Sequence, residues 1–498
     1  MEIQFDRISV PYLKKLADSV RAQEETLEVR LPEGMPDIGR VLGVWGQVIV
    51  RGKEWNSDHM VVSCGVMAWV LYTPEDGDGV RSVEVWLPFS MKWELPETRY
   101  DGKILTKCML KSVDARSISA RKLMVRAVLC ADAQGWQTEQ AQVAIAGELP
   151  EDIELLTATY PVLLPKEAGE KPFLLEEQIT LSNASKPEKL LYYTLQPEVI
   201  DQKVMAGRLV FRGNGALHML YRGEDGDLHN WDYDLPFSQY VDLDGEYEQD
   251  ADVMVQPCVT SLDLSLDENG QLQLKAGVLG QYLLWDRSMV TVAEDAYSPN
   301  RKLELVYEQL ELPSVLDRMI NTVQAELNMQ TDVQQVVDVA FYPSCGQTEQ
   351  MDTGTRILLP GYFQTLYRDE AGELRNMLSS WEDMWNIQAA GESTINTRIA
   401  SIGRTQALVG AGSVSLRADM TVEAVATAGQ GLPMLMGMEM GEPEKPDANR
   451  PSLILCRKGN RKLWDVAKEH RSTVAAIMQA NGLEVEPENG QVLLIPVK

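Results

Sequence analysis

The chain has 498 residues, enough for about three to four domains, and its 44% apolar and 24% charged residues are typical of a globular protein. Its net charge of −28 argues against nucleic acid or an anionic membrane as a partner, because phosphate groups would repel most of this surface. The N-terminus has no basic and apolar regions like those of a secretory signal, and no run of about 18 apolar residues predicts a membrane span.

A short hairpin recurs three times along the chain. The stretch "LYTPEDGDGV" from Leu71 returns as "LYRGEDGDLH" from Leu220 and as "LYRDEAGELR" from Leu366. Apolar runs flank each copy, and "LPFS" follows the first two. Each turn holds a glycine where a short loop needs a positive φ, namely Gly77, Gly226 and Gly372. The repetition predicts copies of one β unit.

Other strand-like segments surround each hairpin. "PDIGRVLGVWGQVIVRG" (36–52) precedes the first copy and resembles "DQKVMAGRLVFRG" (201–213) and, more weakly, residues 332–345. We therefore predict a mainly β fold with three tandem, related sandwich-like or barrel-like units at 1–150, 151–300 and 301–430, the third diverged. Helical or irregular segments such as "PSVLDRMINTVQAEL" (313–327) would join them. A linker rich in proline, glycine and acidic residues is predicted at 431–451.

The tail at 452–498 differs in charge from the rest. It holds seven Lys and Arg against five Asp and Glu, a net charge of +2, whereas the remainder carries −30. "SLILC" and "QVLLIP" predict two strands, and "LWDVAKEH" and "STVAAIMQANG" predict two helices between them. Ser472 or Thr473 is placed to cap the second helix and Gly482 to end it. The predicted order of this small domain is β-α-α-β.

Little in the sequence points to catalysis, a cofactor or a metal. The four histidines are far apart, and none is spaced with another His or a Cys as metal ligands are. Glu75-Asp76 and Glu224-Asp225 lie in hairpin turns, where carboxylates are normally solvated. The acidic stretch at 242–252 lacks the spacing of a calcium loop. The six cysteines occur singly, which favours reduced thiols in a cytosol. We expect no enzyme, no catalytic residue, no cofactor and no bound metal.

The tail resembles a LysM module, because "LWDVAK", "TVAAIMQANGL" and "GQVLLIP" occur in the order typical of that family. The matching residues are Gly459, Leu463, Trp464, Val466, Ala467, Thr473, Val474, Asn481, Leu483, Gly490, Gln491, Leu493, Ile495 and Pro496. The upstream units resemble SPOCS domains, whose start is like "PDIGRVL" at 36–42. The combination is similar to SipL-type spore coat morphogenetic proteins of Clostridia and, less closely, to SpoVID-type proteins of bacilli.

This resemblance implies a non-enzymatic adaptor in the mother-cell cytosol, at the forespore surface. It would tether the coat by binding SpoIVA, the ATPase of the coat's basal layer, through the LysM-like module. The SPOCS-like units would associate with themselves or with other coat proteins. The alternative function is binding of the N-acetylglucosamine glycan of peptidoglycan through the same module.

One departure from the LysM pattern bears on this choice. Glycan-binding modules usually carry Gly-Asp-Thr-Leu before the first helix, whereas Gly459–Leu463 reads "GNRKL", with two long cations. This argues against sugar binding and favours contact with an acidic protein surface. The predicted partner-binding residues are Arg457, Lys458, Arg461, Lys462, Trp464, Ile477 and Asn481. The other interpretation is that Trp464 packs within its own domain and the cations form a solvated face.

Overall fold

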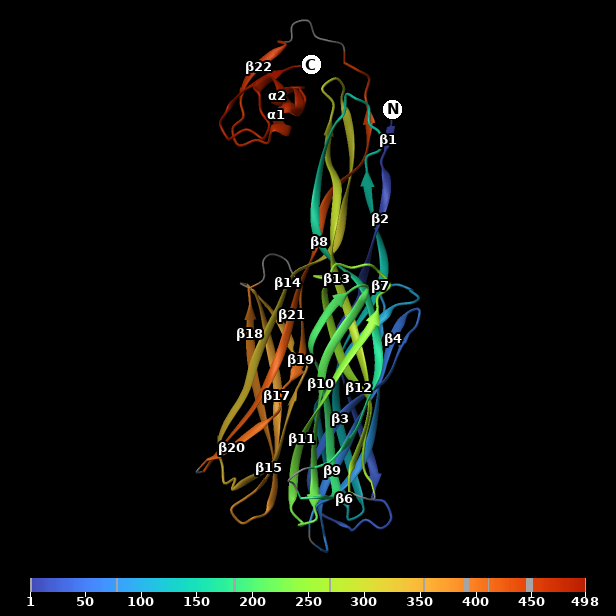
Figure 1. Cartoon of the computed structure of the whole chain (residues 1–498), viewed down its shortest axis with the longest axis vertical. Helices are drawn as coiled ribbons and strands as arrows, with labels where there is room; N and C mark the ends of the chain where they lie inside the picture. The colour runs from blue at the N-terminus through green and yellow to red at the C-terminus, as the bar shows by residue number, and fades with distance from the viewer. Residues whose placement is uncertain are drawn as a thin grey trace.

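The computed structural model describes residues 2–77, 79–181, 185–267, 270–352, 354–388, 394–410, 412–444 and 451–497. The fold is mainly β, as predicted, and the described part of the chain holds two short helices. The molecule is elongated: three β units lie side by side at one end, a narrow neck extends from them, and a small C-terminal module lies beside the tip of the neck (Figure 1).

Unit 1 consists of two three-stranded antiparallel sheets. In pairing order, the first sheet contains β2 (Asp6–Arg30), β7 (Lys122–Ile145) and β6 (Lys103–Ser119), and the second contains β3 (Ile38–Trp55), β4 (His59–Pro74) and β5 (Arg81–Glu94). Alternate residues of β5 are buried from Val83 to Trp93, the period of two that a strand with one covered face requires. They enter a core shared with β4 and β7.

Unit 2 repeats this arrangement. Its first sheet contains β8 (Glu154–Ile179), β13 (Leu272–Tyr297) and β12 (Asp252–Leu266), and its second contains β9 (Pro187–Met205), β10 (Arg208–Gly223) and β11 (Leu228–Asp242). In each unit the last long strand pairs with the first strand and is the middle strand of the first sheet, and the second sheet is a simple meander.

Unit 3 has the same plan with extra strands. The long pair is β14 (Leu303–Gln330) and β21 (Ser413–Met440), and β21 also pairs with β19 (Thr394–Ile402), β20 (Gln406–Gly410) and the N-terminal β1 (Glu2–Gln4). The second sheet contains β15 (Gln335–Pro343), β16 (Gln347–Met351), β17 (Gly354–Arg368) and β18 (Leu374–Ile387). Because β1 pairs with β21, the start of the chain is joined to its third unit.

The three predicted hairpins are confirmed as β4–β5, β10–β11 and β17–β18. Their glycines have φ values of +101°, +84° and +79° at Gly77, Gly226 and Gly372, in the region that costs other residues steric strain. Tyr72 and Tyr221 each lie two residues before the end of the first strand of a hairpin and are fully buried. The repeated Leu-Tyr and glycine therefore mark an anchor and a turn.

Three details of the predicted organisation are wrong. Residues 313–327 are not helical. They belong to β14, which pairs with β21 from end to end. Residues 431–440 are the end of β21 and not linker, and residues 445–450 of the predicted linker lie outside the described residues. Residues 201–213 cross the turn between β9 and β10, so β9 and not that segment is equivalent to β3.

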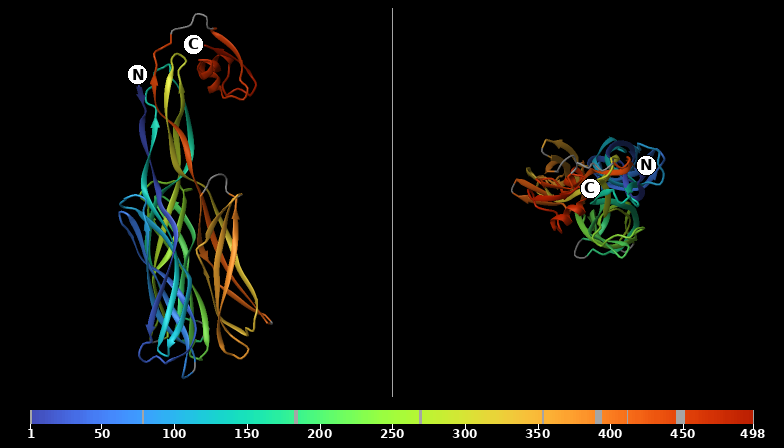
Figure 2. Two further views of the ribbon diagram at one scale, coloured as in Figure 1. Left: turned by 180° about the vertical axis from the view of Figure 1, so that it is seen from behind. Right: turned by 90° about the horizontal axis from the view of Figure 1, so that it is seen from above.

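The units pack around a common long axis rather than following one another in a row, as the view from above shows (Figure 2). Units 1 and 2 meet through aromatic rings: Trp45 and Tyr192 stack with centroids 5.2 Å apart, and the tilted rings of Trp69 and Tyr193 have centroids 4.9 Å apart. The ends of the long pairs β2–β7, β8–β13 and β14–β21 continue together as the neck (Figure 1). Val143, Val292 and Leu435 are among the residues of its apolar core.

The C-terminal module comprises β22 (Leu453–Arg457), α1 (Leu463–Glu469), α2 (Val474–Asn481) and β23 (Val492–Pro496), with β22 and β23 antiparallel. The Thr473 hydroxyl caps α2 by accepting the Ala476 N–H at 3.1 Å, and Gly482 ends it in the left-handed region. Apolar residues of both helices and of β23 form one small core.

Candidate partner-binding site in the C-terminal module

Two of the predicted contact residues hold the module together. Ile477 has no exposed surface and lies in the core of the module. The Asn481 side chain donates to the carbonyls of Ile477 and Leu494 at 2.7 and 2.6 Å and accepts the Leu494 N–H at 2.8 Å. These three bonds fasten the end of α2 to β23. Ile477 thus presents no surface to a partner, and the amide of the half-buried Asn481 is already engaged within the module.

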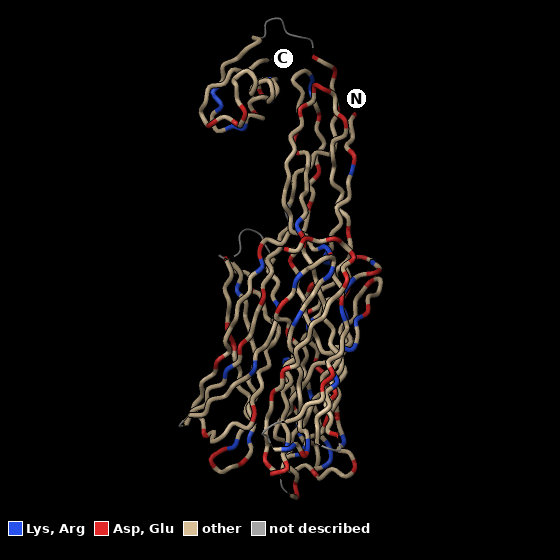
Figure 3. Tube along the Cα trace, in the orientation of Figure 1, with Lys and Arg blue, Asp and Glu red and all other residues tan. Residues whose placement is uncertain are grey.

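Two of the four cations predicted to bind a partner are engaged within the module. Lys458 is buried, and its ammonium group donates to the Pro487 carbonyl at 2.6 Å and lies 3.1 Å from the Glu486 carboxylate. Arg461 forms an ion pair with Glu469 and donates to the Lys458 carbonyl at 3.2 Å. Figure 3 accordingly shows the cations of the module next to acidic positions.

Arg457 and Lys462 are the exposed members of the predicted set of cations. The Nε of Arg457 donates to the Gly490 carbonyl at 3.1 Å, which fixes the side chain against the loop before β23 while the residue remains exposed. Lys462 directly precedes α1. A cation at a helix N-terminus is unfavourable with respect to the helix dipole, so Lys462 contributes little to the stability of α1.

Trp464 contacts the neck of its own chain. It is buried, and its ring packs edge-on against Tyr297 at the end of β13, with centroids 4.7 Å apart. Its Nε1 donates to the Asp295 carboxylate at 2.9 Å, and Lys468, one turn further along α1, donates to the same carboxylate at 2.7 and 2.8 Å. Trp464 thus packs partly in the core of its own module and partly against unit 2.

The electrostatics of this docking contact centre on Asp295. Burial alone would raise the pKa of this carboxyl, but the hydrogen bonds from Lys468 and Trp464 outweigh it and lower the pKa below its usual value. The Tyr297 hydroxyl donates to the Ser472 carbonyl at 3.0 Å, and Arg471 forms an ion pair with Glu444. The module therefore docks through a charged centre and one aromatic pair. Nothing in the sequence around Asp295 distinguishes it from other strand residues.

A second feature, which the sequence did not predict, is an apolar face on the module's sheet. Leu453 and Leu455 on β22 are 54% and 73% exposed, and Val492 on β23 is 57% exposed. The helices cover the other face, as the alternation of exposed and partly buried residues along β22 indicates. Arg457 lies at the end of this face, opposite Val492. We call Leu453, Leu455, Arg457 and Val492 the outer face.

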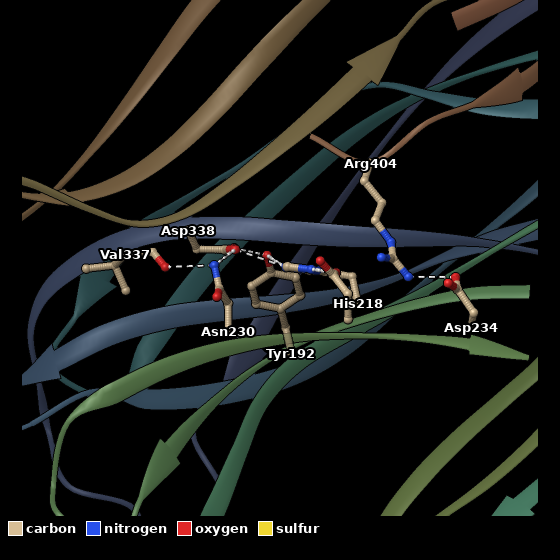
Figure 4. A network of polar contacts seen from close by, with 8 residues as sticks. Tyr192, His218, Asn230, Asp234, Val337, Asp338 and Arg404 are labelled. Atoms are coloured by element: carbon tan, nitrogen blue, oxygen red, sulfur yellow. Dashed lines mark hydrogen bonds and ion pairs between the residues drawn. The ribbon is translucent and has the colours of Figure 1, made fainter. Parts of the chain in front are cut away.

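A polar network around the buried Asp338 joins units 2 and 3 (Figure 4). The two ring nitrogens of His218 lie 2.7 Å from Asp232 and 2.9 Å from Asp338, and the Tyr192 hydroxyl donates to Asp338. Asn230 donates to the Val337 carbonyl at 3.1 Å. Burial alone would lower the pKa of His218, but Asp338 and Asp232 raise it to about 10. The imidazolium is thus held between two carboxylates and offers no free base.

This network borders a cavity of about 200 Å³ that all three units line, with Lys107 from unit 1, Asp232 from unit 2 and Arg404 from unit 3. Arg404 and Asp234 form a further ion pair at 2.6 Å between units 3 and 2. That pair is about half exposed, whereas the Asp338 side chain is fully buried. A buried ion pair adds little net stability but penalises wrong packing, because an unpaired buried charge is costly. The network therefore fixes how the units fit together.

Within the described residues, no group of three or more His, Cys, Asp or Glu is placed to hold a metal ion. No helix in the described part of the chain is long and apolar enough to cross a membrane.

Comparison with known proteins identifies one part of the chain. Residues 186–267 match the family model described as SipL, SPOCS domain. This segment is therefore similar to a SipL-type SPOCS domain. The match spans the second sheet of unit 2, β9 to β11, together with β12. It supports the resemblance to SipL-type spore coat proteins and relates the chain to sporulation. No curated protein and no solved structure matches the chain.

The position of the SPOCS match bears on the other two units. The strands β3 to β6 and β15 to β20 occupy the same places in units 1 and 3 as β9 to β12 do in unit 2. The strand order alone gives these units the same architecture. Their kinship to the SPOCS family stays a prediction from the repeated sequence.

Proposed function

We propose that this protein is a non-enzymatic adaptor of spore coat assembly, acting in the mother cell at the forespore surface. Its C-terminal module would bind the coat's basal-layer ATPase, SpoIVA, and the three β units would contact further coat proteins or other copies of the chain. The observation that carries the proposal is the SipL-type SPOCS match at residues 186–267. The LysM-like identity of the module rests on its sequence pattern.

The geometry supports an adaptor role through the rigidity of the body. The three units share apolar cores, and buried ion pairs such as His218–Asp338 connect them, so the body resists bending between units. The module lies at the far end of the neck from the bulk of the units (Figure 1). An adaptor with distant contact surfaces on a stiff body can hold two layers at a fixed spacing and gain avidity from several weak contacts.

The outer face of the module is the surface that suits a protein partner. It combines exposed apolar side chains at Leu453, Leu455 and Val492 with a cation at Arg457, and interfaces commonly place such an apolar centre beside charged groups. Lys462 adds a second exposed cation. Positive charge here would steer an acidic partner surface towards the module. Trp464 contributes indirectly, since it sets how the module is docked.

The proposal is tested by co-purification of SpoIVA from sporulating cells with the intact chain, with a chain lacking residues 452–498, and with the double variant Arg457→Glu and Lys462→Glu. The intact chain should retain the ATPase, and the other two should lose it. Lys92→Glu is a matched control, because Lys92 is an exposed cation on β5 of unit 1, far from the module. Equal recovery by all four proteins would refute the proposed contact.

Pelleting with insoluble cell wall tests the alternative glycan function in the same preparations. If the intact chain pellets and the chain without residues 452–498 does not, the module binds glycan. That result would favour the alternative function over binding of a protein partner.

A further inference from the structure

Two cysteines that are 215 residues apart in the sequence meet between units 1 and 3. The Sγ atoms of Cys130, on β7, and Cys345, just after β15, are 2.6 Å apart. A disulfide has an S–S distance of about 2.05 Å, so the two sulfurs need to approach by only about half an ångström to bond. No other pair of cysteines in the described chain joins two different units through a direct sulfur–sulfur contact.

The backbone around the pair is held in place. The Cys345 N–H points to the Cys130 sulfur at 3.4 Å, and the neighbouring Ser344 N–H donates to the Pro360 carbonyl at 2.8 Å. Cys130 lies in the apolar core shared with unit 3, and β7 pairs on both sides with β2 and β6. The backbone at Cys130 is therefore set by sheet structure, and that at Cys345 by the end of β15 two residues earlier and the Ser344 hydrogen bond, so bond formation requires mainly side-chain adjustment.

The chemical environment favours a thiolate on one sulfur. The hydrogen bond from Cys345 lowers the pKa of Cys130 to about 7, against the opposing effect of burial, with further help from the Cys345 N–H, the Ser344 hydroxyl and Lys111. The thiolate is the form of cysteine that reacts with oxidants and disulfides. Cys345 is partly exposed, which gives a small oxidant access to the pair, and it lines a cavity of about 20 Å³ with Lys107 and Asp132.

We propose that Cys130 and Cys345 are a redox-active pair that closes into an intramolecular disulfide linking unit 1 to unit 3. With a peroxide as the oxidant, one thiol attacks the O–O bond, which breaks to give a sulfenic acid and water. The second thiolate attacks that sulfur, the S–S bond forms, the S–O bond breaks and hydroxide leaves. Overall, two thiols and one hydrogen peroxide give one disulfide and two waters. A dithiol reductant reverses the step.

The consequence of this bond is a covalent clamp across the long axis. It closes a loop that contains the whole of unit 2, and closing so long a loop restricts the unfolded chain strongly. It also prevents unit 3 from moving away from unit 1. The oxidised protein should therefore unfold at a higher temperature than the reduced protein. The inference does not depend on the proposed function.

The test uses the full chain, reduced and then exposed to hydrogen peroxide, with free thiols counted by alkylation and the bridge located by non-reducing peptide mass spectrometry. Two of the six thiols should disappear, the Cys130 and Cys345 peptides should be joined, and the melting temperature should rise and return on reduction. Cys345→Ser should retain its remaining thiols and show no shift. Cys456→Ser, which removes a thiol in the C-terminal module, should behave as the unaltered chain does.

Cys64 and Cys108 provide a discriminating comparison, because their side chains also hydrogen bond to each other, within unit 1. A bridge mapped to Cys64 and Cys108, a bridge between two chains, or six thiols that all remain free would each overturn the proposal. If Cys345→Ser does not fold, Cys345→Ala at this partly exposed position serves instead, with the same expected loss of the bridge.

Discussion

Replacing Asp295 by Asn should release the C-terminal module from the neck. The Asp295 carboxylate accepts hydrogen bonds from the Trp464 indole and the Lys468 ammonium, and both helix residues depend on this one side chain from unit 2. An amide of the same size keeps the volume but loses the charge, and its NH₂ group faces a donor on at least one side. The apolar contact between Trp464 and Tyr297 is unaffected.

The expected loss follows from the individual contacts. A hydrogen bond to a charged group contributes about 1.5–3 kcal/mol. The Lys468 pair is partly exposed and adds less, on the order of 0.5 kcal/mol after screening by solvent. Taken together, Asp295→Asn should weaken docking by about 2 kcal/mol, which lowers the ratio of docked to released module roughly 30-fold. Lys468→Met alone should lower that ratio only about twofold to threefold.

The exchange rate of the Trp464 indole hydrogen measures docking directly. In protein labelled at tryptophan nitrogen, this resonance can be assigned with Trp464→Phe, and its exchange should accelerate roughly 30-fold in Asp295→Asn. Asp465→Asn is the matched control, since Asp465 is an exposed acid on the same helix. Unchanged protection of the indole in Asp295→Asn would refute the docking geometry.

Three further outcomes are expected. First, because the pKa of His218 is raised from 6.5 to about 10, the folded state holds an extra proton between these values, so the stabilisation is complete below pH 6.5 and is lost as pH rises through 10. Urea unfolding from pH 6 to 10 should show the free-energy gap between the unaltered chain and His218→Gln shrinking with pH, and a constant gap would contradict the assignment. Second, Gly226→Ala should cost about 1–2 kcal/mol because Gly226 has φ of +84°, whereas Gly52→Ala, which meets no atom within 4 Å, should be nearly neutral; equal midpoints in urea would count against strain at the turn. Third, Leu455→Asp should reduce SpoIVA capture at least tenfold. It should not lower the melting temperature, because this side chain is exposed and its loss leaves no cavity. Loss of capture in Val485→Asp, an equally exposed control in the same module, would show that the effect is not specific to the outer face.

The sequence predicted best what depends on local chemistry. The repeated Leu-Tyr and the turn glycine locate all three hairpins, because a tight turn with positive φ restricts the residue type whatever surrounds it. The caps of α2 at Thr473 and Gly482 were predictable for the same reason. In each case the decisive contacts lie within a few residues of one another.

Elsewhere the tertiary context outweighed the local signal. Residues 313–327 carry apolar residues at spacings that fit a helix, yet pairing with β21 along their whole length makes them a strand. Val323 and Ala325 are buried on alternate positions, a period of two that the polar residues around them obscure. The predicted linker was shortened likewise, because methionines such as Met434 and Met438 fill the apolar core of the neck.

The candidate site shows the same division. Arg457 and Lys462 are exposed as a basic loop would predict, but the burial of Lys458 depends on the carbonyl of Pro487, 29 residues later. The partner of Trp464 is Asp295, 169 residues earlier in another unit. Contacts of such long range leave no periodicity or motif in the sequence, and a single chain offers no other signal by which to find them.

The most direct test of the adaptor account is a binding titration of purified SpoIVA against the purified full chain and against the chain lacking residues 452–498. The account predicts saturable binding by the full chain and at least a hundredfold weaker binding by the shortened chain. The β units of the two proteins should unfold at the same temperature. Equal affinity of the two proteins for the ATPase would contradict it.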